Sequence, residues 1–244
     1  MPFLIPLLLL CSQEESWPRP EEIEQIRTKT AYVLDQGEVE VDFVGSFLRF
    51  DEGGRKFDES RLMVEMEVGV TDWLMAEIEV PYLFFNPRNG PGERGWGDVE
   101  LELKAGIPGH WNGFQLAVGL EVSLLTGDED KGLGSPETEL GFFVAVSRRF
   151  GWLAAHLQGA VEAAKDVRAE YEVRFALDAS PWGRDFSLLL ALNGEIERGE
   201  GAGWSLVPGF EVRLDEFQFG FGFPIGLTEE AEKWGVIVDV ELEF

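Results

Sequence analysis

The sequence has little of what several classes of function require. It contains one cysteine and two histidines, and its 20 Lys and Arg face 46 Asp and Glu, so its formal net charge is −26. A single cysteine excludes an internal disulfide. The two histidines, His110 and His156, lie too far apart in sequence for a metal-binding pair of the usual spacing. The shortage of basic residues argues against nucleic acid as a partner, because phosphate binding requires cations.

No apolar run is long enough to cross a bilayer as a helix, which needs about 20 residues. The apolar run at residues 3–11 resembles the core of a secretory signal, although no Lys or Arg precedes it and Cys11 lacks the small preceding residue of a lipoprotein signal. We therefore expect export, with residues 1–12 as a signal-like segment. Residues 13–36 are predicted to be a polar leader with a short helix at 20–26, where a proline and acids suit a first turn.

What the sequence does have is alternation, and it is clearest in residues 234–244. Every second residue there is apolar, and the residues between them end in Asp239, Glu241 and Glu243. A period of two places the two sets on opposite faces of a strand. Two structures fit: the closing strand of a transmembrane β-barrel, with carboxylates toward the lumen, and an edge strand of a soluble β-protein.

The same alternation recurs from Gly37 to the C-terminus, between turn residues. It predicts about twelve strands, each long enough to cross a membrane when tilted. Their expected ranges are 37–50, 61–71, 73–85, 97–107, 113–125, 137–150, 152–164, 169–179, 186–198, 204–214, 217–227 and 234–244. The predicted fold class is all-β, an antiparallel up-and-down transmembrane β-barrel over residues 37–244.

The connections and tryptophans favour the membrane interpretation. Short connections, such as 71–72 and 215–216, nearly alternate with longer ones at 51–60, 86–96, 126–136, 198–203 and 228–233. Bacterial outer-membrane barrels have short periplasmic turns and longer outer loops. Tryptophan prefers the membrane boundary, and seven of the eight fall at expected strand ends: Trp73, Trp111, Trp152 and Trp182 at one end, and Trp96, Trp204 and Trp234 at the other.

If the apolar face of each strand contacts lipid, the polar residues that alternate with the apolar ones face the lumen. The expected lumen-facing residues are Glu38, Glu40, Asp42, Glu65, Glu67, Glu77, Glu79, Glu100, Glu102, Lys104, Glu121, His156, Arg174, Glu195, Glu211, Arg213, Asp239 and Glu241. One sign of charge dominates this set, so an open lumen is expected to prefer cations or neutral solutes to anions. A soluble, secreted barrel that encloses a hydrophobic ligand would reverse the two faces, and a structural outer-membrane protein would have a plugged lumen.

The sequence offers no convincing catalytic or metal site. Carboxylates repeated along one strand face suit a charged wall better than acid–base chemistry. Residues 128–130 are acidic but lack the spacing of an EF-hand, and no serine can be paired with His156 from the sequence. We expect a protein that is not an enzyme and has no cofactor.

Four stretches resemble a known family. They are Thr28–Val41 (TKTAYVLDQGEVEV), Gly69–Tyr82 (GVTDWLMAEIEVPY), Gly97–Lys104 (GDVELELK) and, the most specific, Leu125–Ser135 (LTGDEDKGLGS). Together they resemble the outer-membrane barrel family associated with the MetA pathway of phenol degradation, often described as transporters. The resemblance spans about Thr28 to Phe244 and consists of strands and turns, so no functional residue is carried over. It implies transport of phenol-like compounds.

These observations predict an outer-membrane barrel for passive or facilitated transport of small solutes, including hydrophobic or aromatic compounds. The expected partners are outer-membrane lipid, small-molecule solutes and the barrel-assembly machinery, which would engage the C-terminal strand. The expected location is the outer membrane of a Gram-negative-type bacterium.

Overall fold

The structure is a computed structural model that describes residues 22–23, 26–52, 55–108, 112–164, 169–197, 201–214 and 216–244. The predicted signal-like segment at 1–12, with Cys11, lies outside these residues, as do His110 and Trp111. None of the described residues belongs to a helix with the length and hydropathy that a membrane crossing requires.

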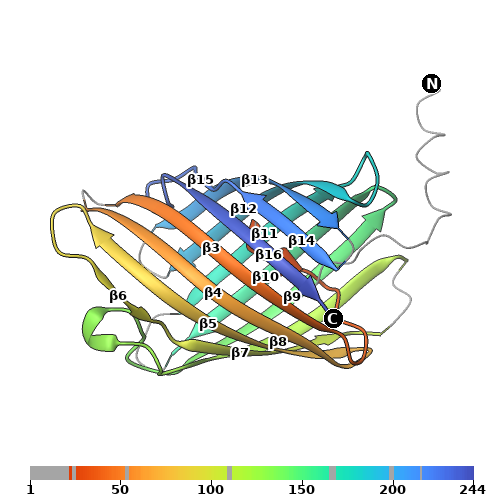
Figure 1. Cartoon of the computed structure of the whole chain (residues 1–244), viewed down its shortest axis with the longest axis horizontal. Helices are drawn as coiled ribbons and strands as arrows, with labels where there is room; N and C mark the ends of the chain where they lie inside the picture. The colour runs from red at the N-terminus through yellow and green to blue at the C-terminus, as the bar shows by residue number, and fades with distance from the viewer. Residues whose placement is uncertain are drawn as a thin grey trace.

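The described chain forms a closed antiparallel barrel of 12 strands (Figure 1). Each strand pairs with the next along the chain, and pairing of the last strand with the first closes the ring from Trp234↔Arg49 to Glu243↔Glu40. The strands are β3 (Val39–Glu52), β4 (Arg55–Thr71), β5 (Leu74–Pro87), β7 (Val99–Gly106), β8 (Phe114–Leu124), β9 (Glu139–Phe150), β10 (Leu153–Ala163), β11 (Glu170–Ala179), β12 (Phe186–Glu197), β13 (Ala202–Leu214), β14 (Phe217–Gly222) with its continuation β15 (Ile225–Gly226), and β16 (Trp234–Glu243). The predicted fold class is confirmed.

One predicted loop is wrong. Residues 51–60 were expected to form a long connection, but β3 and β4 remain paired as far as Glu52↔Arg55. The charges that suggested a loop lie opposite each other on the two strands: Arg49 donates to Asp58 at 2.8 Å, and Lys56 pairs with Asp51 at 2.9 Å. Cross-strand ion pairs of this kind stabilise a hairpin, so charge density alone did not indicate a loop here.

The two faces of the barrel wall differ sharply in polarity. Large apolar side chains on its outward face are exposed, for example Leu62 at 56%, Leu120 at 59% and Leu140 at 59%. Polar side chains that alternate with them are buried, and Glu65 is only 1% exposed. The soluble-barrel alternative requires the opposite arrangement, with the apolar set inside.

The two ends of the barrel also differ. The chain ends at Phe244 beside short turns between β4 and β5, β9 and β10, and β13 and β14 (Figure 1). Gly151 takes a positive φ of 67° in one of these turns, a conformation that suits glycine. Trp73, Trp152 and Trp182 are exposed in turns at this end, which we name the C-terminal end. The longer loops, with the short strand β6 (Glu93–Trp96), lie at the opposite end (Figure 1).

The leader does not form the predicted α-helix at Glu22–Ile23. β1 (Glu22–Ile23) pairs with β2 (Thr28–Lys29), and Arg27 between them takes a positive φ of 53°. Residues 26–36, which we name the lumen segment, then lead to β3. Ile26, Thr28 and Thr30 have no exposed surface. The predicted helix at 20–26 is therefore wrong at Glu22–Ile23, because these residues pair as a strand with Thr28–Lys29.

Candidate functional site: the lumen and its segment

One side of the lumen carries two rows of carboxylates. Strand register aligns the first row directly across neighbouring strands: Glu40↔Glu67↔Glu77↔Glu102↔Glu121. It aligns the second as Glu241↔Asp42↔Glu65↔Glu79↔Glu100. Like charges directly opposite each other destabilise a sheet, so these rows require cations or protons nearby.

The other side of the lumen carries small apolar side chains among its polar ones. Alanines at inward positions of β8 to β12 are almost entirely buried: Ala117, Ala145, Ala154, Ala176 and Ala191. Small side chains leave space beside the wall, and the lumen segment fills it.

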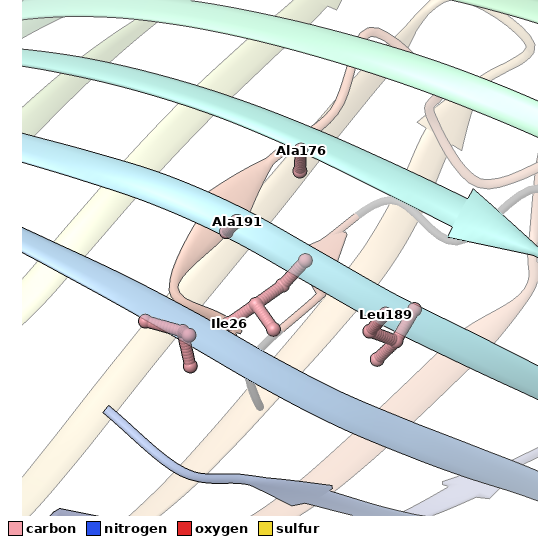
Figure 2. Packing of buried hydrophobic residues seen from close by; sticks show 5 residues of the cluster. Ile26, Ala176, Leu189 and Ala191 are labelled. Carbon is pink, nitrogen blue, oxygen red and sulfur yellow. The ribbon is translucent and has the colours of Figure 1, made fainter. Parts of the chain in front are cut away.

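Apolar residues of the lumen segment pack on this alanine-lined wall. Ile26 clusters with Ala176, Leu189, Ala191 and Val207, and Figure 2 shows it beside the first three. Further along the segment, Ala31 forms a second cluster with Ala117, Phe143 and Ala145 of β8 and β9. The segment thus contacts strands from β8 to β13 through apolar surface.

Hydrogen bonds from polar wall residues satisfy the backbone of the segment. Lys29 N donates to Gln158 Oε1 at 3.0 Å, and Ala31 N donates to Ser147 Oγ at 2.9 Å. Asn193 Nδ2 donates to the carbonyl oxygen of Ile26 at 3.0 Å. Buried backbone groups without such partners would be costly, so these side chains make the lumen compatible with an inserted chain.

The side chain of Lys29 reaches the acidic side of the lumen. Its Nζ lies 3.4 Å from Glu77 Oε1 and 3.2 Å from Glu121 Oε1, and it also contacts Glu102. The three glutamates come from β5, β7 and β8 and belong to the first carboxylate row. One ammonium therefore offsets the repulsion among three aligned carboxylates.

Arginines neutralise other parts of the lumen. Arg61 pairs with Glu79 at 2.9 Å, Arg149 with Asp178 at 2.9 Å, and Arg213 with Glu211. Arg27 of the lumen segment pairs at 2.7 Å with Glu232, in the connection before β16. Four of the cations in these contacts, Lys29, Arg27, Arg61 and Arg149, were not in the predicted set. The carboxylates Asp178 and Glu232, with which two of them pair, were not in it either.

His156 has a serine partner that the sequence could not identify. Its Nδ1 lies 2.8 Å from Ser147 Oγ on the neighbouring strand, and both side chains are buried. Because Ser147 Oγ already accepts the N–H of Ala31, its own proton is available to donate to the histidine. This arrangement anchors the lumen segment, and nothing in it aims the hydroxyl at a substrate.

The structure places most of the predicted lumen-facing residues at inward positions of strands, with two levels of burial. The buried ones are Asp42, Glu65, Glu67, Glu77, Glu102, Lys104, His156, Glu211 and Asp239, and the partly exposed ones are Glu40, Glu79, Glu100, Glu121, Arg174, Glu195, Arg213 and Glu241. Glu38 precedes β3, and its Oε2 accepts the N–H of Asp35 at 2.8 Å. The alternation predicts these inward positions. It does not predict the lumen segment, for which the alanines at inward positions of β8 to β12 were the available signal in the sequence.

Two groups of carboxylates are close enough to share a cation. They are Asp42, Asp239 and Glu241, and Glu65, Glu67 and Glu77, with ligand oxygens within 4.8 Å of one another in each group. Oxygen ligands of this type suit Ca²⁺ or Mg²⁺, but acidic walls form such groups without an ion, and we assign no metal to them.

The predicted connection 126–136 is a folded loop at the end opposite the C-terminal end. The carboxylate of Asp98 accepts backbone N–H groups of Thr126, Gly127 and Ser135. Lys131 pairs with Asp128, and this hydrogen bond raises the pKa of the lysine. The acidic residues of this loop therefore serve its own folding.

Comparisons with known proteins agree on the fold. No family model matches the chain, and no curated protein matches it. Among solved structures, it is similar to the COG4313 outer membrane channel from Pseudomonas putida F1, with a TM-score of 0.76 and 13% identity over 94% of this chain and 100% of that one. It is also similar to the NanC porin (TM-score 0.59, 11% identity, 83% and 98% covered) and to the KdgM porin (TM-score 0.56, 9% identity, 84% and 98% covered). At these identities the similarity shows a shared barrel fold.

Proposed function

We propose that this protein is an outer-membrane channel for passive transport of small solutes. The observation that carries the proposal is the polarity of the closed barrel, with large apolar side chains exposed outside and carboxylates buried inside. An outward apolar band, a polar interior and short turns at one end are the features of bacterial outer-membrane barrels. The fold shared with an outer membrane channel and two porins supports the same function.

The lumen is expected to select solutes by charge and by size. The two carboxylate rows raise the local concentration of cations and repel anions. The lumen segment packs on the alanine-lined side, so we expect solutes to pass along the acidic side, where Glu40, Glu79 and Glu100 are partly exposed. Cations and small neutral molecules are the solutes that suit this path.

Three finer points are proposals that rest on the sequence. The resemblance to the MetA-pathway family implies phenol-like cargo. Export by the signal-like segment at 1–12 would deliver the barrel of 37–244 to the outer membrane of a Gram-negative-type bacterium. The barrel-assembly machinery would engage β16, the strand that closes the ring.

Cell fractionation with liposome swelling tests this function. The protein is expected in the outer-membrane fraction, to require detergent for extraction and to migrate differently on a gel with and without heating. Liposomes that contain it should swell in small neutral or cationic solutes. Recovery as a detergent-free monomer from periplasm or medium would contradict the membrane location.

A plugged structural barrel is the second candidate, and the buried lumen segment favours it. Deleting residues 22–36 distinguishes the channel from the plugged structural barrel. A channel should conduct before the deletion and more strongly after it, whereas a structural barrel should admit solutes only after the deletion.

A further inference from the structure

Arg148 is a charged residue within an apolar part of the outward face. The outward positions that precede it on β9 are Leu140, Phe142, Val144 and Val146. Its guanidinium carbon lies 4.4 Å from the ring centroid of Phe114 and 4.8 Å from that of Phe150. The two phenylalanines are 43% and 46% exposed, so the arginine and both rings form one surface.

No described residue provides an acidic partner for this arginine. Its cross-strand neighbours are Phe114 on β8 and Ala155 on β10. Its side chain makes no hydrogen bond or ion pair with another described residue. The connection that follows β7 includes Gly-His-Trp at 109–111, which contains no carboxylate.

A guanidinium between aromatic rings keeps its hydrogen-bonding edge available. The rings interact with the positive charge through their faces, whereas the N–H donors require oxygen acceptors in the plane of the group. Phosphate matches that donor arrangement and accepts two parallel hydrogen bonds from arginine. The chemistry of this surface therefore fits a phosphate group.

The position of Arg148 on the barrel specifies which phosphate is available. It lies near the end of β9, close to the turn that contains Gly151 and the exposed Trp152. Exposed tryptophans mark the boundary between acyl chains and headgroups. Arginine on the outward face of a barrel is tolerated near this boundary, where lipid phosphates lie.

We propose that Arg148, with Phe114 and Phe150, binds the phosphate of an anionic phospholipid in the leaflet at the C-terminal end. This inference rests on the membrane location in the proposed function. An anionic headgroup is favoured because the surface carries an unneutralised positive charge. The rings contact the upper acyl chains while the guanidinium holds the headgroup.

Native mass spectrometry of the detergent-purified barrel tests the site. The probes are phosphatidylglycerol, which is anionic, and phosphatidylcholine, which is zwitterionic. Arg148→Gln is expected to weaken phosphatidylglycerol binding about fivefold, the effect of one basic residue at a membrane surface. Arg94→Gln is the matched control, because Arg94 is exposed on β6 at the opposite end and its replacement removes the same charge.

Two results would overturn the proposal: equal phosphatidylglycerol binding by Arg148→Gln and the wild type, or an equal loss in both variants. If Arg148→Gln does not fold, lipid binding by the wild-type protein at different salt concentrations tests the site instead. A preference for phosphatidylglycerol that weakens as salt rises supports the site, and no preference contradicts it. A heat-modifiable, detergent-dependent protein without this preference would refute the lipid site alone, whereas a detergent-free soluble protein would refute the membrane location.

Discussion

Lys29 Nζ lies 3.4 Å from Oε1 of Glu77, a residue of β5 that is 48 positions further along the chain. The same ammonium contacts Glu102 and lies 3.2 Å from Glu121. Aligned carboxylates on neighbouring strands repel one another, so the lumen segment supplies a cation where the wall needs one. The segment is both a filler of the alanine-lined side and a counter-ion for the acidic side.

Replacing Lys29 with Gln should loosen the lumen segment and leave the carboxylate row without this ammonium. The free energy of unfolding is expected to fall by about 1–3 kcal/mol, the cost of leaving buried charged groups without a partner. The temperature at which the folded gel band disappears measures this change.

Lys131→Gln is the control for that variant, because Lys131 is exposed and pairs with Asp128 in the outer loop. Exposed pairs contribute little to stability, so this control should keep the wild-type transition. Equal transitions in both variants would show that the Lys29 contacts do not hold the segment.

A disulfide should form between the lumen segment and the wall. Ala31 N lies 2.9 Å from Ser147 Oγ, so cysteines at these two positions are expected to cross-link under mild oxidation once Cys11 is replaced by serine. Non-reducing gel mobility measures the cross-link. Ala31→Cys with Ser205→Cys is the control. Ser205 lies beside Arg27, near the start of the lumen segment, and not beside Ala31. Cross-linking in the control alone would contradict the position of the segment.

The two faces of β16 should respond differently to arginine. Val238→Arg places charge on the outward face near the middle of the strand, where it costs about 2–4 kcal/mol in a membrane. Asp239→Arg should be milder, because two carboxylates, those of Asp42 and Glu241, lie beside this position. Unfolding in detergent measures both.

Cysteine labelling checks the same faces independently of stability. Cysteine at position 238 should react with a lipid-soluble reagent. Cysteine at position 241, an inward position of the same strand that is partly exposed, should react with a small water-soluble one. The reverse pattern would refute the assignment of the two faces.

Gly119 should not tolerate a side chain. A methyl group there would overlap the ring of Phe143, which is fully buried on the neighbouring strand. Gly119→Ala is expected to destabilise the barrel by about 1–3 kcal/mol, the usual cost of overpacking. Gly159→Ala is the matched control, since its nearest neighbour would be 4.0 Å away. Equal stability of the two variants would show that Phe143 can move.

Alternation predicted the barrel well because each strand has one face in each environment. On β4 the same pattern separates Glu65 and Glu67, which are buried, from Val64 and Met66, which are exposed. The lumen segment was not predicted, because its contacts join residues distant in sequence, such as Ile26 and Ala176. The contact between Ser147 and His156 depends on strand register, which turn lengths decide and alternation does not.

The reversal potential across a planar bilayer under a salt gradient tests the central claim most directly. The wild-type protein is expected to conduct with a preference for cations, because carboxylates dominate its lumen. Replacing Glu65, Glu67, Glu77 and Glu79 with Gln should weaken that preference, since it removes charge while nearly preserving side-chain volume. A preference for anions, or the absence of any conductance, would contradict the account of this barrel as an acidic channel for small solutes.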